Sequence, residues 1–79
     1  MYLRSRSVAL PESDFAGVKA HNGKFEASKL QGSDFSGADL RGARFDTVSL
    51  RGCDFRQADL RGAAFVDCDL REASLHAVL

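Results

Sequence analysis

Large apolar residues recur along this chain with a period of five. Every phenylalanine stands at a multiple of five, and so do seven of the leucines. The residue two places before each of them is small, its immediate neighbours carry most of the charge, and the residue two places after it is often glycine. With this residue in the third position, where Ala20 is the one small exception, fourteen units of five follow one another without a gap from Val8 to Ala77.

A period of five excludes a regular helix or a long flat strand. Five residues rotate an α-helix by about 500°, so the apolar side chains would be spread around the whole helix. Side chains alternate along a strand, so an odd period would place them on both faces. A three-residue strand followed by a corner fits, because positions one and three then point inward and positions two and four point outward. Glycine suits the corner at position five because it adopts positive φ without strain.

The number of units in one coil follows from a second, longer repeat. The six residues from Ala38 to Ala43 recur unchanged from Ala58 to Ala63, twenty residues later. With twenty residues per coil, Phe stacks on Phe along two sides and Leu on Leu along the other two. A coil of fifteen residues would mix Phe and Leu in each column. The pattern therefore predicts four units per coil and about three and a half coils, joined by parallel β-pairing.

The units resemble those of the pentapeptide-repeat family. The likeness is carried by Ala-Asp-Leu-Arg-Gly at 38–42 and 58–62 and by Ser-Asp-Phe-Ser-Gly at 33–37. It implies an all-β fold, a right-handed, four-sided parallel β-helix, and the hand is implied by the resemblance alone. We expect residues 8–79 to form this β-helix and residues 1–7 to form an N-terminal cap or a disordered lead.

The charge balance and the cysteine content limit the partners and the cellular compartments that fit this chain. Eleven bases balance eleven acids, which argues against a nucleic-acid binder because such proteins usually carry a basic excess. Cys53 and Cys68 stand at small, inward positions, where we expect them to act as small hydrophobic residues and not as a disulfide framework. No apolar run is long enough to span a membrane, and no signal peptide is recognisable, so we expect a cytoplasmic protein.

The outward charged residues form the candidate interaction face. The spacing places acids and arginines in columns on neighbouring sides of the coil. One interpretation is a ladder of negative charge, since some relatives in the family are proposed to mimic DNA, bind DNA gyrase and confer quinolone resistance. The other is a solvated face in which the aspartates satisfy local backbone donors and pair with neighbouring arginines, with Asp/Arg pairs across neighbouring strands. The residues of this candidate face are Asp34, Asp54, Asp39, Asp59, Arg41, Arg61, Arg51 and Arg71.

A filled solenoid with flat walls has no place for a catalytic pocket. We find no catalytic set, phosphate loop or metal-ligand pattern in the sequence, and expect no enzyme activity, cofactor or metal. The preferred function is a protein-interaction or scaffold module with an unidentified protein partner. The alternative is a DNA mimic that binds gyrase. No direct binding to nucleic acid or membrane is expected.

The last residues of the chain are apolar and still follow the repeat. A solenoid exposes unpaired backbone at its ends, and such an edge needs to be capped or paired. We expect Leu75, Val78 and Leu79 to meet the same end of a second copy in a two-fold dimer. The alternative is a module from a longer chain.

Overall fold

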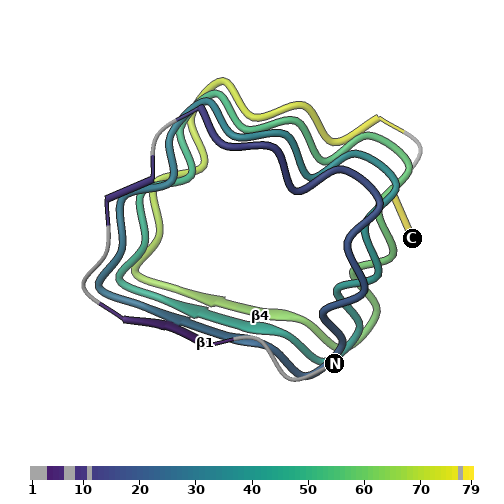
Figure 1. The fold of residues 1–79 in the computed structure, drawn as a ribbon, viewed down its shortest axis with the longest axis horizontal. Helices are drawn as coiled ribbons and strands as arrows, with labels where there is room; N and C mark the ends of the chain where they lie inside the picture. Colours follow the sequence, from purple (N-terminus) through teal and green to yellow (C-terminus); the bar gives the residue numbers. More distant parts are fainter. Residues whose placement is uncertain (1–3, 7–8, 11, 77) are drawn as a thin grey trace.

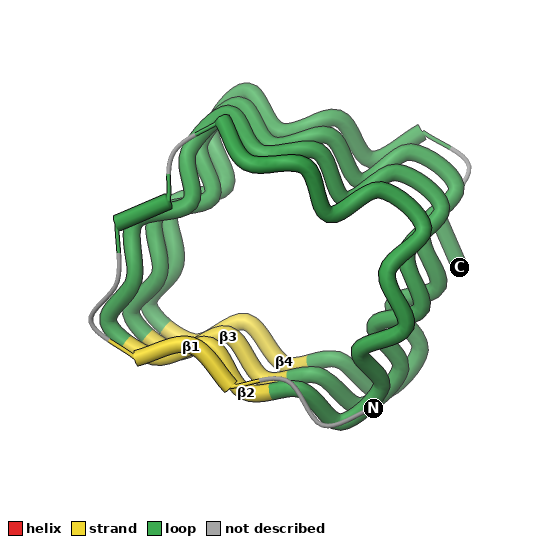
Figure 2. The backbone as a smooth tube through the Cα atoms, in the orientation of Figure 1, coloured by secondary structure: helices red, strands yellow, loops and turns green. Residues whose placement is uncertain are grey.

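The computed structural model describes residues 4–6, 9–10, 12–76 and 78–79. The described chain winds as stacked coils around one axis, which is the direction of view in Figure 1. One side of the coil carries four short strands that form a parallel sheet in the order β1-β2-β3-β4 (Figure 2). These strands are β1 Arg4–Arg6, β2 Lys24–Glu26, β3 Arg44–Asp46 and β4 Ala64–Val66.

Residues twenty apart in the sequence lie beside one another in neighbouring coils. In the strands, Phe25 pairs with Phe45 and Phe45 with Phe65. The same offset holds at the isolated parallel bridges, which form three further ladders. These bridges join Ala9 to Lys29, Lys29 to Ser49 and Ser49 to Asp69; Asp14 to Asp34, Asp34 to Asp54 and Asp54 to Ser74; and Lys19 to Asp39 and Asp39 to Asp59.

The corners between units are turns whose fifth position has positive φ. At one corner the amide of Ala38 donates to the carbonyl of Phe35 at 3.1 Å, and Gly37 between them has a φ of 67°. A type II turn has this bond and needs positive φ at its third residue, where glycine is the least strained choice. Non-glycine residues also have positive φ at equivalent positions, among them Ala27 and Thr47.

The core consists of the third-position side chains, and the phenylalanine rings among them stack on one another from coil to coil. The ring centroids of Phe25 and Phe45 lie 4.5 Å apart with planes 2° from parallel, and Phe35 stacks on Phe55 at 5.2 Å. The two phenylalanine columns meet edge to face, at 88° between Phe35 and Phe45. Small first-position residues such as Ala43 fill the space between them and are fully buried. The prediction of an all-β parallel solenoid with inward Phe and Leu is therefore confirmed.

The start of the chain continues the same pairing. Within the segment predicted as a cap or disordered lead, residues 4–6 form β1, and Ser5 pairs with Phe25 as Phe25 pairs with Phe45. The remaining residues of that segment, 1–3 and 7, lie outside the described ones, so the boundary at residue 7 stays a prediction.

Candidate interaction surface

The predicted interaction residues lie on three different sides of the coil. Asp39, Arg41, Asp59 and Arg61 share one side, and the bridge between Asp39 and Asp59 aligns their units. Another side carries Asp34 and Asp54, which are also bridged to each other, and a third carries Arg51 and Arg71. The structure therefore brings together the first four residues as one surface and separates it from the others.

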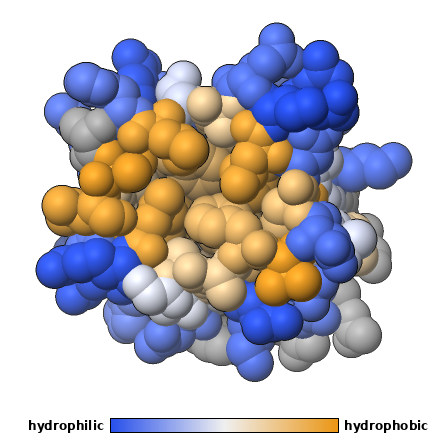
Figure 3. Space-filling model, turned by 180° about the vertical axis from the view of Figure 1, so that it is seen from behind, coloured by the Kyte–Doolittle hydropathy of each residue, from blue (hydrophilic) through white to orange (hydrophobic). Residues whose placement is uncertain are grey.

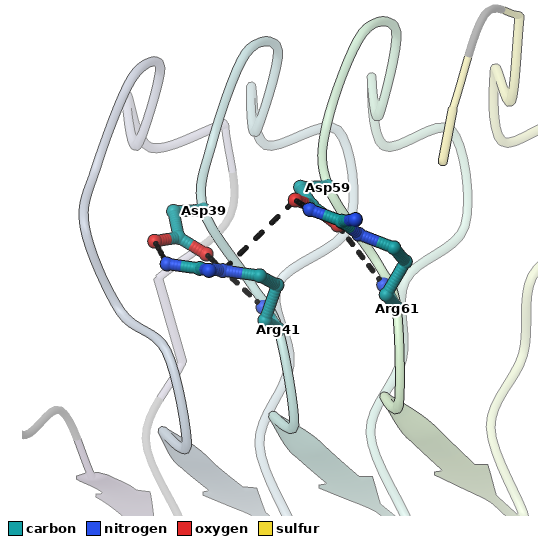
Figure 4. A network of polar contacts seen from close by, with 4 residues as sticks. All are labelled: Asp39, Arg41, Asp59 and Arg61. Atoms are coloured by element: carbon teal, nitrogen blue, oxygen red, sulfur yellow. Dashed lines mark hydrogen bonds and ion pairs between the residues drawn. The ribbon is translucent and has the colours of Figure 1, made fainter.

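On the first side each arginine is bound to the aspartate of its own unit (Figure 4). Arg41 donates from Nε to Asp39 Oδ1 and from a terminal nitrogen to Asp39 Oδ2, both at 2.8 Å. Arg61 binds Asp59 in the same way, at 2.9 and 2.6 Å. Such two-point pairs between guanidinium and carboxylate fix geometry as well as adding attraction.

The pairing follows from the repeat itself. Positions two and four of a unit both point outward with one inward residue between them, so their side chains lie on the same side of the coil. The aspartate also accepts the backbone amide of its arginine, as at Asp39 and Arg41, 3.3 Å apart. We call this arrangement an Asp–Arg clip. Four clips are described: Asp39–Arg41, Asp54–Arg56, Asp59–Arg61 and Asp69–Arg71.

Of the two pairings expected, the local one predominates, and pairing between coils is the minor form. Arg41 Nε lies 3.9 Å from Asp59 Oδ2, at the outer limit of an ion pair. Arg51 reaches Glu72 of the following coil at 2.7 Å. The local pair predominates because an aspartate two residues away in the same unit is held beside the arginine by the local backbone. The aspartate of the next coil competes with it from a greater distance.

The clips place arginine outside and carboxylate beneath. In the four clips the arginine side chains are 53 to 72% exposed, whereas the aspartate side chains are 19 to 32% exposed. The hydrogen bonds from Arg41 lower the pKa of Asp39 to about 2, and those from Arg71 do the same for Asp69. The outer layer of these sides therefore consists of guanidinium groups above ionised carboxylates.

One acidic column differs from the clipped ones. Asp14 and Asp34 accept the backbone amides of Ala16 and Ser36, at 3.0 and 2.8 Å. Among the described residues no salt bridge joins either carboxylate to a base. The reason is that small residues stand at the fourth position in these two units, where Arg56 stands one coil after Ser36.

A cleft lies on the side that carries this acidic column. It has a volume of about 360 Å³ and is lined by Ser36, Arg56, Gln57 and His76. Sequence reasoning did not find it, because it depends on how Arg56 is held. The sequence does contain a signal for this cleft. In this column Ser36 is followed, at intervals of twenty residues, by Arg56 and His76, whose side chains are longer and carry nitrogen atoms.

The described residues offer little for redox or metal chemistry. They contain no group of three or more His, Cys, Asp or Glu residues that could hold a metal ion. Cys53 and Cys68 are free, and burial raises the pKa of both thiols. The part of the chain that is described also contains no helix long and apolar enough to cross a membrane.

The predicted dimer residues lie at the C-terminal end of the solenoid. Leu75 and Leu79 are 48 and 67% exposed, and Val78 is partly buried against the core. Seen from behind, the molecule shows a hydrophobic patch that reaches the left edge of this face and is flanked by hydrophilic residues above, below and to the right (Figure 3). Leu70 and Phe65, which are also only partly buried, belong to the last coil.

Five-residue units, twenty-residue coils and a core of stacked Phe and Leu define a parallel β-helix of pentapeptides. A family described as the pentapeptide repeat region matches residues 6–75. The chain therefore belongs to the pentapeptide-repeat family, as the resemblance of its units predicted. None of the curated proteins compared with it matches the chain.

Solved structures of pentapeptide-repeat proteins are similar to this fold. Rfr23 from the cyanobacterium Cyanothece 51142 matches with a TM-score of 0.64 and 24% identity, over 95% of this chain and 58% of that one. The fluoroquinolone resistance protein QnrB1 matches at 0.59 and 20%, over 89% and 49%. The protein alr5209 from Nostoc Pcc 7120 matches at 0.54 and 31%, over 85% and 64%. The chain thus spans roughly half to two thirds of these proteins, and the likeness to the first two concerns the fold alone.

Proposed function

We propose that this chain is a non-enzymatic protein-interaction module that binds its partner through the side carrying Asp39, Arg41, Asp59 and Arg61. The observation that carries the proposal is the fixed layer of exposed guanidinium groups held by Asp–Arg clips. Arginine is enriched among the residues that dominate binding energy at protein interfaces. A side chain that is already held in place also loses less conformational entropy when a partner binds.

The chemistry of this surface suits a protein partner. Its two bases and two acids balance, so a partner is selected by the geometry of its hydrogen bonds more than by net charge. Each guanidinium keeps donors beyond those used in its clip, and its planar face can stack on an aromatic ring. The β-helix beneath, with its buried phenylalanine columns, holds these groups at a constant spacing.

The test is capture of a partner by the immobilised chain, followed by binding measurements with that partner purified. We expect the double variant Arg41→Gln/Arg61→Gln to bind the purified partner at least about tenfold more weakly, which corresponds to about 1.4 kcal/mol. Arg44→Gln is the matched control, because Arg44 is 54% exposed and lies on the strand-bearing side. Equal weakening by both variants would show that the chosen surface is wrong. A chain that retains no protein would overturn the function itself.

The second candidate is the DNA mimic that binds gyrase. The column of Asp14 and Asp34, whose carboxylates have no salt bridge among the described residues, favours it. The clips argue against it, since Asp39, Asp54 and Asp59 lie beneath arginines and a mimic needs exposed negative charge. A gyrase supercoiling assay separates the two functions. Absence of inhibition at micromolar concentration removes the mimic.

We also propose that the C-terminal end binds a second copy of the chain. The coils measure 27 by 26 Å across, so two such ends placed face to face bury on the order of 1,000 Å², the lower range of specific interfaces. Sedimentation of the wild-type chain is expected to show a concentration-dependent dimer that Leu79→Lys abolishes. Leu10→Lys is the control at the opposite end, where Leu10 is 44% exposed. A wild-type chain that stays monomeric at high concentration contradicts the dimer.

A further inference from the structure

Arg56 differs from the other clipped arginines because it lines a cleft. Ser36 and His76 stand one coil before and one coil after it in the same column, and Gln57 stands at the corner beside it. All four side chains carry hydrogen-bond donors, and no carboxylate is among the lining groups. The volume of about 360 Å³ lies at the small end of the range for sites that hold a compact ligand group.

The clip with Asp54 leaves Arg56 ready for a second carboxylate. Arg56 donates from Nε to Asp54 Oδ1 at 2.9 Å and from one terminal nitrogen to Asp54 Oδ2 at 2.7 Å. A guanidinium has five N–H donors, so this pairing uses one edge of the fork and leaves the opposite edge for another two-point contact. Asp54 therefore positions Arg56, because it fixes the guanidinium plane before any ligand arrives.

The surrounding charge selects the kind of anion. Asp54 is bound to Arg56, and the charge of Asp34 also acts on its guanidinium. These two carboxylates offset the positive charge of Arg56, so a doubly charged phosphate is repelled more strongly than a singly charged carboxylate. The hydroxyl of Ser36 and the amide of Gln57 supply neutral donors, which suit a monoanion that is held by hydrogen bonds.

We propose that this cleft binds the side-chain carboxylate of a glutamate or aspartate in the protein partner, with Arg56 as the anchor. The proposal rests on the proposed function, since it names the chemistry of one contact with that partner. The corner at Gln57 leads directly to Ala58 and Asp59, where the proposed interaction side begins. One partner can therefore cover that side and reach around the corner into the cleft.

The test uses a small probe and needs no partner. N-acetyl-glutamate α-amide carries one side-chain carboxylate, and N-acetyl-glutamine α-amide has the same shape without the charge. In an NMR titration of the whole chain, we expect the glutamate probe to produce saturable shifts at the Gln57 side-chain amide and the His76 ring. The glutamine probe and inorganic phosphate are expected to bind at least about tenfold more weakly.

Two variants with equivalent clips complete the design. Arg56→Gln is expected to weaken binding of the glutamate probe at least about tenfold, whereas Arg71→Gln leaves it within about twofold. Arg71 is the matched control because its side chain is 72% exposed, against 60% for Arg56, and it is clipped in the same way. An unchanged amide spectrum for the core phenylalanines shows that each variant is folded.

Three outcomes overturn the proposal. These are shifts that do not saturate, equal weakening by Arg56→Gln and Arg71→Gln, and tighter binding of phosphate than of the glutamate probe. If the glutamate probe does not bind, the capture experiment with the Arg41 and Arg61 variant can still succeed. The two experiments therefore test the cleft and the proposed function independently.

Discussion

The thiol of Cys53 occupies the place in its coil that the hydroxyl of Ser33 occupies one coil earlier. Cys53 Sγ donates to the carbonyl oxygen of Leu30 at 3.0 Å, and Ser33 Oγ donates to the carbonyl oxygen of Leu10 at 3.2 Å. Both side chains are fully buried. In these two units the first position therefore holds a small side chain that donates to a backbone carbonyl, and the two residue types are equivalent there.

This equivalence predicts the order of two substitutions. Cys53→Ser keeps a donor for the Leu30 carbonyl and is expected to destabilise the fold less than Cys53→Ala. The alanine variant loses one buried hydrogen bond and is expected to cost about 1 kcal/mol more than the serine variant. Urea unfolding of the three proteins measures the difference. A serine variant less stable than the alanine variant would contradict this assignment.

The stacked core predicts a large effect at Phe45. Its side chain is fully buried, and its ring stacks on Phe25 at 4.5 Å and on Phe65 at 4.9 Å. Phe45→Ala is expected to cost about 3–5 kcal/mol, as for other buried phenylalanines. Arg51→Ala is expected to cost less than about 0.5 kcal/mol, because Arg51 and its partner Glu72 are 52 and 69% exposed. Similar melting shifts for the two variants would refute the assignment of inward and outward positions.

The clips predict a response of stability to acid. The pKa of Asp39 is lowered to about 2 in the folded chain from an ordinary value of 3.8, because Arg41 donates to its carboxylate. A group with a depressed folded pKa contributes its full stabilisation above its unfolded pKa and loses it as the pH falls through the folded value. Stability is therefore expected to decline between about pH 4 and pH 2.

The same clip can be followed at a single carboxyl group. The side-chain carbon of Asp39, observed by NMR, is expected to titrate with a midpoint of about 2 in the wild-type chain. Arg41→Gln is expected to raise that midpoint toward the ordinary value of an aspartate, and Arg44→Gln to leave it unchanged. An Asp39 midpoint that does not respond to Arg41→Gln would refute the clip.

The corner conformation predicts a stabilising substitution. Thr47 has a φ of 57°, a region that L-residues avoid and β-branched residues avoid most. Thr47→Gly is expected to stabilise the fold by roughly 0.5–1 kcal/mol, since the relief of strain exceeds the entropic cost of glycine. Gly37→Ala is the opposite test. The φ of Gly37 is 67°, and a Cβ added there would meet nothing within 4 Å. The unfavourable backbone conformation is then the only source of destabilisation, and the expected cost is about 1 kcal/mol. Thermal unfolding in which Thr47→Gly melts below the wild-type chain would argue against the strain.

The sequence predicts those structural features that repeat along the chain and misses those that do not. Phe45 and Leu40 were assigned to the core from their spacing alone, and both are fully buried. Ser5 was not recognised as part of a unit, because a serine stands where a large apolar residue marks the other units. Only its pairing with Phe25 places its backbone in the sheet.

The interaction surface was predicted only in part. The columns of Asp39 with Asp59 and of Asp34 with Asp54 follow from the twenty-residue coil, and the bridges place them as expected. Two partners stayed open for each arginine, because aspartates of its own unit and of the next coil are both near it. The competition is decided by side-chain geometry, which the pattern of residue types does not contain.

The sequence by itself determined the solenoid, since a period of five leaves the backbone one way to line a shared interior with the Phe and Leu columns. It also determined which residues face outward, because alternation within a three-residue strand admits no other choice. The tertiary structure decided what those outward residues do. The cleft beside Arg56, and the choice that each arginine makes between nearby aspartates, arise from contacts between individual side chains, whose energies are small and local.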